Sequence, residues 1–206
     1  MRKLIVSNIM SLDSYCAGPG KDTSFLPMDG AFDAYNAERL RAADTFLLGR
    51  KTYDMFRGFW PSVAENASAS STNREISRLM NAIDKLVISN SMDLAQPEPW
   101  LNTRVIRRAD AHKQLAKLKR QTGKDIFVGG SHIMWNDLLA NGLVDELHLM
   151  VGPVVVGAGT SIFKGQPDVS FRLIDMRKWD GSENALIRYE VRRQKASRPT
   201  RKGKSK

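Results

Sequence analysis

The sequence predicts an α/β domain with a mainly parallel β-sheet and an antiparallel C-terminal edge. Short apolar runs alternate with segments of helical periodicity through most of the chain, which is the pattern of a parallel sheet with crossover helices. Two amphipathic segments, 169–177 and 185–193, then close the chain as a hairpin with its turn at Asp180-Gly181. The chain has 206 residues, which suits one ordinary domain with a full core.

The N-terminal half shows a clear change from helical to strand patterning. Phe32, Tyr35 and Leu40 lie at helical spacing, and the buried apolar run that follows ends at Gly49. Residues 61–72 are polar and of low complexity, so we expect a loop there, and whether it acts as a lid stays open. The expected elements are a strand at 3–10, a helix at 31–43, a strand at 45–49, a short helix at 50–59, a helix at 73–82 and a strand at 85–90.

The C-terminal half continues the alternation. A strand is expected at 103–107, followed by a helix with Asp110 as its N-cap and Gly123 as its stop signal. Residues 126–128 are a short buried strand that passes through two glycines into another helix. The segment 144–156 alternates at first and is then wholly apolar, which predicts one long strand.

The net charge of +10 is concentrated at one end of the chain. Eight basic residues and no acidic residue lie between Arg192 and Lys206, so the rest of the chain carries only +2. The segment 194–206 lacks large apolar residues and is expected to be a disordered tail. Nucleic acid is therefore not an expected partner, apart from non-specific contacts of this tail with polyanions.

The cysteine and histidine content excludes several kinds of site. Cys16 is the only cysteine, so no intrachain disulfide can form, which favours a reducing, cytoplasmic location. The N-terminal apolar run is too short for a signal peptide, and no segment is long enough to span a membrane. His112, His132 and His148 lack the spacing of metal ligands, so we expect no metal site.

The first unusual strand end is the segment Gly129-Gly130-Ser131. A parallel sheet places its binding sites at the carboxyl ends of its strands, and here the strand passes directly into a helix. A helix N-terminus offers unpaired N–H donors, and glycines allow an anion close to the backbone. A phosphate site and a simple tight turn are both compatible with this segment.

A second strand end places two cations at the start of a helix. Arg50, Lys51 and Thr52 follow Gly49 directly. Cations are unfavourable at a helix N-terminus because they oppose the helix dipole, unless an anion binds between them. This strand end is thus a second candidate for phosphate.

A third strand end carries small polar side chains. Ser89, Asn90 and Ser91 follow one predicted strand, and Arg107 ends the next. Three strand ends that favour anions on one side of a sheet are typical of a site for a dinucleotide with several phosphates.

The order of five motifs resembles the dihydrofolate-reductase-like superfamily. These motifs are MSLD, LLGRKTYD, LVISNS, IFVGGSHIMWNDLL and VDELHLMVGPVVVGAGTSIF, the last being the most specific. Within the superfamily they look most like the reductase domain of bacterial riboflavin biosynthesis. The resemblance implies a three-layer α/β/α sandwich around a mostly parallel eight-stranded sheet, formed by residues 1–193, with NADPH as the hydride donor.

The resemblance also assigns positions to the cofactor. It implies that the helix start after Gly49 and the glycine pair hold the phosphates, and that Arg107 meets the 2′-phosphate of NADPH. Arg108 is expected to point to the opposite face of a continuing strand. The full set of expected cofactor positions is Ala17, Gly49, Arg50, Lys51, Thr52, Ser89, Asn90, Arg107, Val128, Gly129, Gly130, Ser131, His132 and Ile133.

The resemblance implies a catalytic carboxylate on the first long helix. Asp33 has the expected spacing of sixteen residues before Gly49. Asp29 lies one helical turn earlier and is the alternative. The chain departs from dihydrofolate reductases at Pro27-Met28, where those enzymes have proline followed by tryptophan, and this puts dihydrofolate in doubt as the substrate.

Two classes of function remain from the sequence. The first is an NADPH-dependent reductase of a small pterin-like or pyrimidine-like heterocycle or another polarised C=N or C=O group, including a stand-alone reductase of the ribosylaminopyrimidine phosphate of riboflavin synthesis. A zinc deaminase domain is the usual partner in that pathway, and its Cys-x-x-Cys signature is absent here. The second class is a non-catalytic nucleotide-binding module with a polyanion-binding tail. The resemblance and the apolar run at 148–156 also predict a homodimer.

Overall fold

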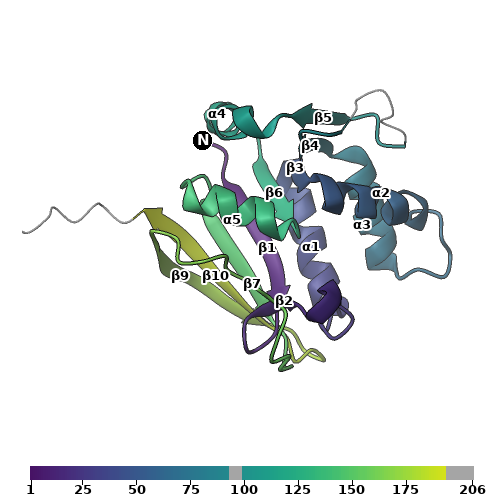
Figure 1. Cartoon of the computed structure of the whole chain (residues 1–206). Helices are drawn as coiled ribbons and strands as arrows, with labels where there is room; N and C mark the ends of the chain where they lie inside the picture. The colour runs from purple at the N-terminus through teal and green to yellow at the C-terminus, as the bar shows by residue number, and fades with distance from the viewer. Residues whose placement is uncertain (93–98, 194–206) are drawn as a thin grey trace, which may run out of the picture.

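An eight-stranded sheet forms the centre of the molecule (Figure 1). The computed structural model describes residues 1–92 and 99–193, so the predicted tail at 194–206 lies outside the described residues. The strand order is β5-β4-β3-β6-β1-β7-β10-β9. All pairs from β5 to β7 are parallel, and β10 is antiparallel to both of its neighbours. The strands are β1 (Leu4–Met10), β3 (Ala43–Gly49), β4 (Asp84–Ile88), β5 (Thr103–Ile106), β6 (Asp125–Gly129), β7 (Glu146–Val151), β9 (Val169–Lys178) and β10 (Ala185–Arg193).

Helices cover both faces of this sheet. Side chains of α1, α2 and α3 pack with the sheet in one apolar cluster, and side chains of α4 and α5 pack on the other face in a second. The arrangement confirms the three-layer α/β/α sandwich and its mostly parallel sheet. The helices are α1 (Gly30–Ala42), α2 (Arg50–Val63), α3 (Ser71–Ala82), α4 (Arg108–Lys119) and α5 (His132–Ala140), and the short elements are β2 (Tyr15–Ala17), η1 (Pro19–Lys21) and β8 (Thr160–Ser161).

The central strands are continuous apolar runs because both of their faces are covered. In β3, Phe46 and Leu48 pack in the cluster on the α1–α3 side, and Leu47 packs in the cluster on the α4–α5 side. All three side chains are fully buried. Strands of this kind place their ends, rather than their faces, within reach of a ligand.

The expected loop at 61–72 is present but shorter than predicted, because only residues 64–70 lie outside helices. α2 continues through Pro61 to Val63, and α3 already begins at Ser71. Two contacts between the helices explain the extension. The Ser77 hydroxyl donates to the Trp60 carbonyl at 2.5 Å, and the Asn81 amide donates to the carbonyl of Pro61.

The expected limits of α4 were also wrong. Strand β5 ends at Ile106, and Arg107 rather than Asp110 occupies the N-cap position. The Asn90 side chain, on another loop, accepts a hydrogen bond from the Arg108 N–H at 3.0 Å and so satisfies this helix start. The helix ends at Lys119, well before Gly123. Because the strand does not continue, the expectation that Arg108 points to the opposite face of a strand is wrong.

The apolar run at 148–156 is covered by the chain only in its first part. Strand β7 ends at Val151, and β1 and β10 pair with it on either side. Leu147, Leu149 and Met150 are buried within the chain. The prediction of one long strand at 144–156 was therefore wrong, because pairing stops at Val151; beyond it Val155 is 74% exposed, and the dimer stays a prediction.

A buried polar network fastens α1 to the sheet. His148 of β7 is fully buried, its Nδ1 lies 2.6 Å from the Tyr35 hydroxyl of α1, and its Nε2 lies 2.9 Å from Glu146. Burial lowers the pKa of His148 against the opposing effect of Glu146. Lys3 donates to the same glutamate at 2.7 Å. This network fixes the position of the helix that carries Asp29 and Asp33.

Candidate cofactor and acceptor site

Three neighbouring strands end along one edge of the sheet. β4, β3 and β6 lie side by side, and they end at Ile88, Gly49 and Gly129. The strands are parallel, so these carboxyl ends share one edge, as the sequence predicts.

In the turn from β6 into α5, the backbone conformation requires glycine at one of the two positions. Gly130 has φ +64°, in the left-handed region where a Cβ is unfavourable. A Cβ there would also lie 3.3 Å from the Thr52 side chain of α2. Ser131 follows at φ 53°, which is uncommon for a residue with a side chain and is often found at functional sites.

Two hydrogen bonds join the starts of α2 and α5. The Gly49 N–H donates to the Ser131 hydroxyl at 3.0 Å, and the Ser131 N–H donates to the Thr52 hydroxyl at 3.2 Å. Two predicted phosphate segments that are about eighty residues apart in the sequence are thus in direct contact. The glycine turn lets the two helix starts come this close.

The helix starts differ in their capping. Asp29 caps α1 and Ser70 caps α3, each by a side-chain oxygen that accepts from the first turn. The N-cap residues of α2 and α5, Gly49 and Ser131, make no such bond. Their first-turn N–H groups therefore remain available to an anion.

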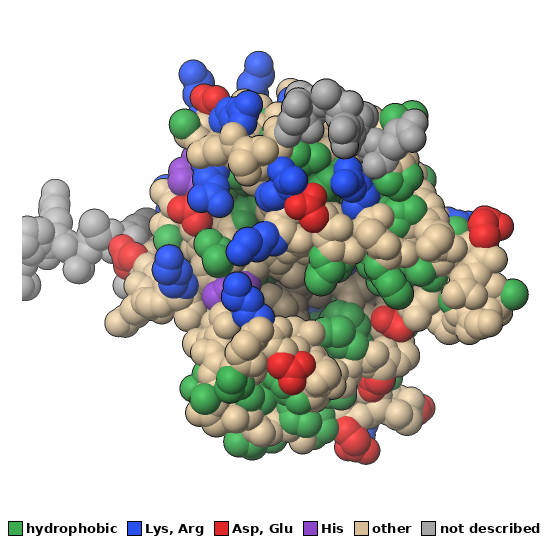
Figure 2. Space-filling view, turned by 45° about the vertical axis from the view of Figure 1, so that its right-hand side comes forward, with side chains coloured by type: hydrophobic (Ala, Val, Ile, Leu, Met, Phe, Trp, Pro, Cys, Tyr) green, Lys and Arg blue, Asp and Glu red, His purple; other side chains and the backbone are tan. Residues whose placement is uncertain are grey.

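Positive charge surrounds these helix starts. Arg50 is half-buried, pairs with Asp54 at 2.5 Å and donates to the Ser91 carbonyl at 3.3 Å. Lys51 is exposed. Figure 2 shows one face of the molecule with a hollow near its centre, Lys and Arg side chains gathered mainly on its upper part and hydrophobic side chains around the hollow.

The third predicted strand end forms a second cluster beside the first. The Arg107 guanidinium donates to the Asn90 carbonyl, and both residues are exposed. Ser89 is buried, and its hydroxyl accepts from the backbone N–H groups of Ser91 and Met92. Its side chain therefore shapes the loop, which leaves Asn90 and Arg107 as the accessible groups of this cluster.

The expected cofactor positions on β6 and at the start of α5 differ in how far their side chains are accessible. Val128 is fully buried in the core. The His132 ring Nε2 lies 3.0 Å from the Ile162 carbonyl, and the ring packs edge-on against Trp135, so this ring is engaged elsewhere. Ile133 is exposed at the start of α5.

Ala17 ends the short strand β2, which is held tightly against a glycine-rich segment. A Cβ on Gly159, whose φ is +136°, would lie 2.2 Å from the Ala17 carbonyl oxygen. Asp13, in the turn before β2, fastens this region because its carboxylate accepts from the backbone N–H groups of Val156 and Gly157. Asp13 was not among the predicted site residues, although it ends the MSLD motif.

Asp29 and Asp33 have different roles in the structure. The Asp29 carboxylate accepts from the N–H groups of Ala31 and Phe32 and from the Ser182 hydroxyl, at 2.6–3.1 Å. Burial alone would raise the pKa of Asp29, but these hydrogen bonds lower it below its ordinary value. Asp29 is therefore a helix cap, whereas Asp33 makes no part of the cap.

The Asp33 carboxyl group has an unusual acidity. Burial, followed by repulsion from Asp29, raises its pKa to about 6, and a hydrogen-bonding interaction with the Asn73 side chain acts in the opposite direction. A carboxyl group that is partly protonated near neutral pH can give or take a proton. Asn73 lies on α3 and no sequence motif pointed to it.

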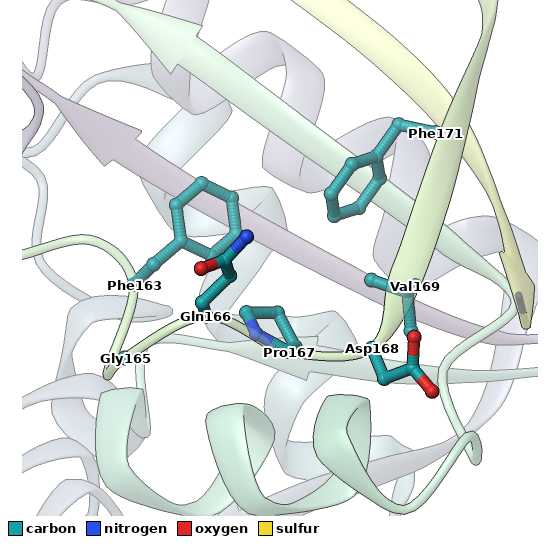
Figure 3. Close-up of a pocket in the computed structure, with 7 residues that line it drawn as sticks. All are labelled: Phe163, Gly165, Gln166, Pro167, Asp168, Val169 and Phe171. Carbon is teal, nitrogen blue, oxygen red and sulfur yellow. The ribbon is translucent and has the colours of Figure 1, made fainter. Parts of the chain in front are cut away.

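A separate pocket of about 430 Å³ lies at the other end of the sheet (Figure 3). The rings of Phe163 and Phe171 and the side chains of Gln166 and Val169 line it. Val169 begins β9. The last residue of β9, Lys178, pairs with Ala185 of β10, which in turn pairs with Val151 at the carboxyl end of β7. The pocket therefore lies toward the amino ends of the parallel strands, away from the predicted site.

The described residues contain neither a metal cluster nor a spanning helix. Within residues 1–92 and 99–193, no group of three or more His, Cys, Asp or Glu side chains is placed to hold a metal ion. None of the helices in the same residues has the length and apolar character needed to cross a bilayer.

Comparison with known proteins gives one family. The profile of the RibD C-terminal domain family matches residues 2–186. The uncharacterized protein YyaP of Bacillus subtilis is 27% identical over 163 residues, which cover 79% of this chain and 80% of YyaP.

Solved structures share the fold. A putative riboflavin biosynthesis protein from Shewanella sp. PV-4 has a TM-score of 0.62 at 20% identity, covering 93% of this chain and 99% of that chain. A dihydrofolate reductase from Enterococcus faecalis complexed with NADP(H) has a TM-score of 0.58 at 14% identity, covering 94% and 97%. The fold and the resemblance seen in the motifs are confirmed, and the chain belongs to the RibD C-terminal domain family.

Proposed function

We propose that this protein is an NADPH-dependent reductase of a small heterocyclic or otherwise polarised C=N or C=O acceptor. One observation carries the proposal: the two uncapped helix starts at Gly49 and Ser131 are joined across a glycine turn. Family membership and the fold shared with reductases support a reductase-type activity.

The residues fit a dinucleotide. Free N–H groups of α2 and α5, with Arg50 and Lys51 beside them, would hold the pyrophosphate. Asn90 and Arg107 would meet the 2′-phosphate, since a guanidinium offers charged donors matched to phosphate oxygens. NADPH supplies the hydride when it is bound, and the protein supplies orientation and electrostatics.

Asp33 would bind the acceptor or transfer a proton to it. A carboxyl group with a pKa raised by burial to about 6 holds a proton over much of the physiological range below neutrality and can transfer it or anchor a ring nitrogen. The buried network of Tyr35, His148 and Glu146 holds α1, and hence Asp33, in a fixed position. The acceptor can be a pterin-like ring or the ribosylaminopyrimidine phosphate of riboflavin synthesis.

The test is oxidation of NADPH by the purified protein with pterin, quinone and pyrimidine acceptors, together with NADPH binding. Turnover with any acceptor supports the reductase. Tight binding of NADPH without turnover would instead identify a nucleotide-binding module, and absence of binding would reject both. The single cysteine, Cys16, suits a reaction in the reducing cytoplasm.

We also propose a homodimer, through the face of the β9–β10 hairpin that carries Phe171, Leu173 and Met176. Phe171, Leu173 and Met176 of β9 are 38%, 48% and 66% exposed, and their partners on β10 are Val191, Tyr189 and Ile187. These six side chains are here called the hairpin face. In Figure 1 the hairpin extends beyond the helices at the lower left.

The two sides of the hairpin differ in polarity. This difference favours a second copy of the chain as the partner that covers the hairpin face. On the opposite side, Arg172 pairs with Glu190, and Arg188 pairs with Asp175. Charged pairs suit contact with water, whereas a continuous apolar face marks a contact surface. A copy of the same chain offers an equally apolar and uncharged surface.

A further inference from the structure

We propose that the pocket at the amino ends of the parallel strands is a second ligand site, for a neutral, planar aromatic compound with an amide-like edge. Phe163, Phe171 and Gln166 would make the main contacts (Figure 3). The pocket is separate from the proposed cofactor and acceptor site, so this ligand is bound whether or not the protein is a reductase.

One bent segment of the chain, residues 163–171, forms the pocket as it passes from β8 to β9. Gly165 has φ +75°, and the Val169 N–H donates to the Pro167 carbonyl at 2.9 Å, so the segment turns twice within a few residues. These turns enclose a volume of about 430 Å³. Sites for small molecules have volumes of about 300–1,000 Å³, so one or two fused rings would fit.

Both ends of this segment are fixed to the rest of the fold. The buried Asn136 side chain of α5 donates to the Ile162 carbonyl at 3.1 Å and accepts from the Lys164 N–H at 2.8 Å. At the other end, Val169 is buried and pairs with Arg193 of β10. The walls of the pocket are therefore in place before a ligand arrives, which reduces the entropy lost on binding.

Aromatic rings form the apolar wall of the pocket. The ring centroids of Phe163 and Phe171 are 6.0 Å apart, and the ring planes are inclined by 45°. A third ring cannot stack between them, because contact on both of its faces needs about 7 Å. A planar ligand would lie across both rings, where an aromatic compound gains more than an aliphatic one of equal area. Phe171 is 38% exposed, so a ligand can reach this wall.

One amide group supplies the polar contact. Figure 3 shows the Gln166 side chain turned toward the same space as the two rings. Gln166 is exposed, and its amide makes no hydrogen bond within residues 1–92 and 99–193. A primary amide offers a donor beside an acceptor. It therefore pairs best with a ring edge that also places a donor beside an acceptor, as a lactam does.

The charge of the lining favours a neutral ligand. Asp168 is the one charged side chain among the described residues that line the pocket, and its carboxylate points away from the rings (Figure 3). An anionic ligand would be repelled by this carboxylate and would find no basic side chain in the lining. An ammonium group would need the carboxylate turned toward the rings, so a neutral ring fits the observed arrangement.

The first experiment titrates the protein with carbostyril, a two-ring lactam, and follows the indole N–H signals of the four tryptophans by NMR. Trp135 packs edge-on against Phe163, with ring centroids 6.1 Å apart, so its signal should shift as the pocket fills. Trp100 lies in the apolar cluster on the other face of the sheet, and its signal should stay unchanged. Trp135→Phe identifies the signal of Trp135.

The second experiment measures the affinity for carbostyril in variants of the lining. Gln166→Ala should bind it about tenfold more weakly, because the hydrogen bonds to the lactam are lost. N-methylcarbostyril, which has the same rings and no N–H, should lose less affinity in this variant. Phe171→Ala should weaken the binding of both compounds. Lys164→Ala, an exposed neighbour outside the lining, is the control and should bind both as the wild-type protein does.

Three results would overturn the proposal. The first is a Trp135 signal that does not move in the wild-type protein, and the second is an unchanged affinity in a Gln166→Ala protein that melts normally. The third is binding of carbostyril to Met176→Lys alone, which would show that a second copy fills the pocket, since Phe171 also belongs to the hairpin face. These measurements use neither NADPH nor turnover, so failure of the proposed reductase would leave their outcome unaffected.

Discussion

At the scale of single residues, the ionised form of Asp33 lowers the stability of the folded protein. Burial raises its pKa from 3.8 to about 6, so the folded protein binds this proton more tightly than the unfolded chain does. Stability is therefore greatest below the unfolded pKa and falls as the pH rises from about 4 to about 6. A partly buried carboxylate that lowers stability is more typical of a functional site than of a structural contact.

Replacing Asp33 with Asn should remove this loss of stability at higher pH. We expect Asp33→Asn to melt at a higher temperature than the wild-type protein above pH 7, with the difference shrinking as the pH falls toward 4. Turnover should fall far more than NADPH affinity, because the group serves the acceptor. Melting curves across pH and steady-state kinetics check both statements.

Asp29→Ala is the matched comparison. This variant loses a helix cap and should be destabilised by about 1 kcal/mol at neutral pH. If Asp29→Asn abolished turnover while Asp33→Asn did not, the assignment of the catalytic carboxylate would have to move by one turn.

Arg107 should contribute to the choice of cofactor. A charged hydrogen bond is worth about 1.5–3 kcal/mol, and the exposure of Arg107 favours the lower end of that range. We expect Arg107→Ala to bind NADPH about tenfold more weakly while its NADH affinity stays the same, as measured by titration with both cofactors. Arg104→Ala, an exposed arginine on β5, should change neither affinity. An equal loss for both cofactors in Arg107→Ala would remove it from the 2′-phosphate site.

At the scale of structural elements, the turn between β6 and α5 depends on one glycine. Gly130→Ala would place a Cβ in the left-handed region, which costs about 1–2 kcal/mol, and press it against Thr52. We expect a lower Tm and weaker NADPH binding, since the two helix starts must move apart. Calorimetry and cofactor titration measure these effects.

Gly58→Ala is the control for that substitution. Gly58 lies within α2, where a Cβ would meet nothing within 4 Å. Alanine there should stabilise the helix by about 1 kcal/mol and leave NADPH binding unchanged. A Gly130→Ala protein as stable as the wild type would show that the turn tolerates a side chain.

The sequence predicted those elements whose pattern is local. The buried runs at Phe46 and Phe127 and the helical spacing of Tyr35 and Leu40 gave strands and a helix close to the observed ones. The segment 61–72 misled because its composition is polar, while the contacts that keep Trp60 and Pro61 helical come from α3. The composition of a segment does not show which distant residues it will contact.

The candidate site was predictable to the same extent. Gly49 and Gly130 have a local signature, a strand that passes into a helix without room for side chains. The bond between Gly49 and Ser131, and the approach of Asn73 to Asp33, join segments that are distant in the sequence. Only the sheet order and the packing of α1 on α3 bring these groups together.

At the scale of the whole molecule, the hairpin face predicts the assembly state. Met176→Lys would place a charge at its most exposed apolar position. If this face joins two copies, the variant should be monomeric by light scattering at micromolar concentrations while the wild-type protein is dimeric. Ser170→Lys, on the other side of the hairpin, should remain dimeric. A monomeric wild-type protein would reject the dimer.

Removal of residues 194–206 should leave the molecule intact. This basic segment has no large apolar side chain to bury, so we expect the truncated protein to keep its Tm and its NADPH affinity. Its binding to polyanions at low salt should be weaker. A marked fall in Tm on truncation would show that the segment stabilises the folded domain.

The position of β10 has a consequence for folding during synthesis. Ribosomes deliver strands in chain order, yet β10, the last strand of the sheet, lies between β7 and β9. Until it emerges, β7 has an unpaired edge and β9 has no neighbour, so the nascent sheet cannot close. A chain stalled before Ala185 would present that edge to other nascent chains, which makes late synthesis the stage most exposed to aggregation.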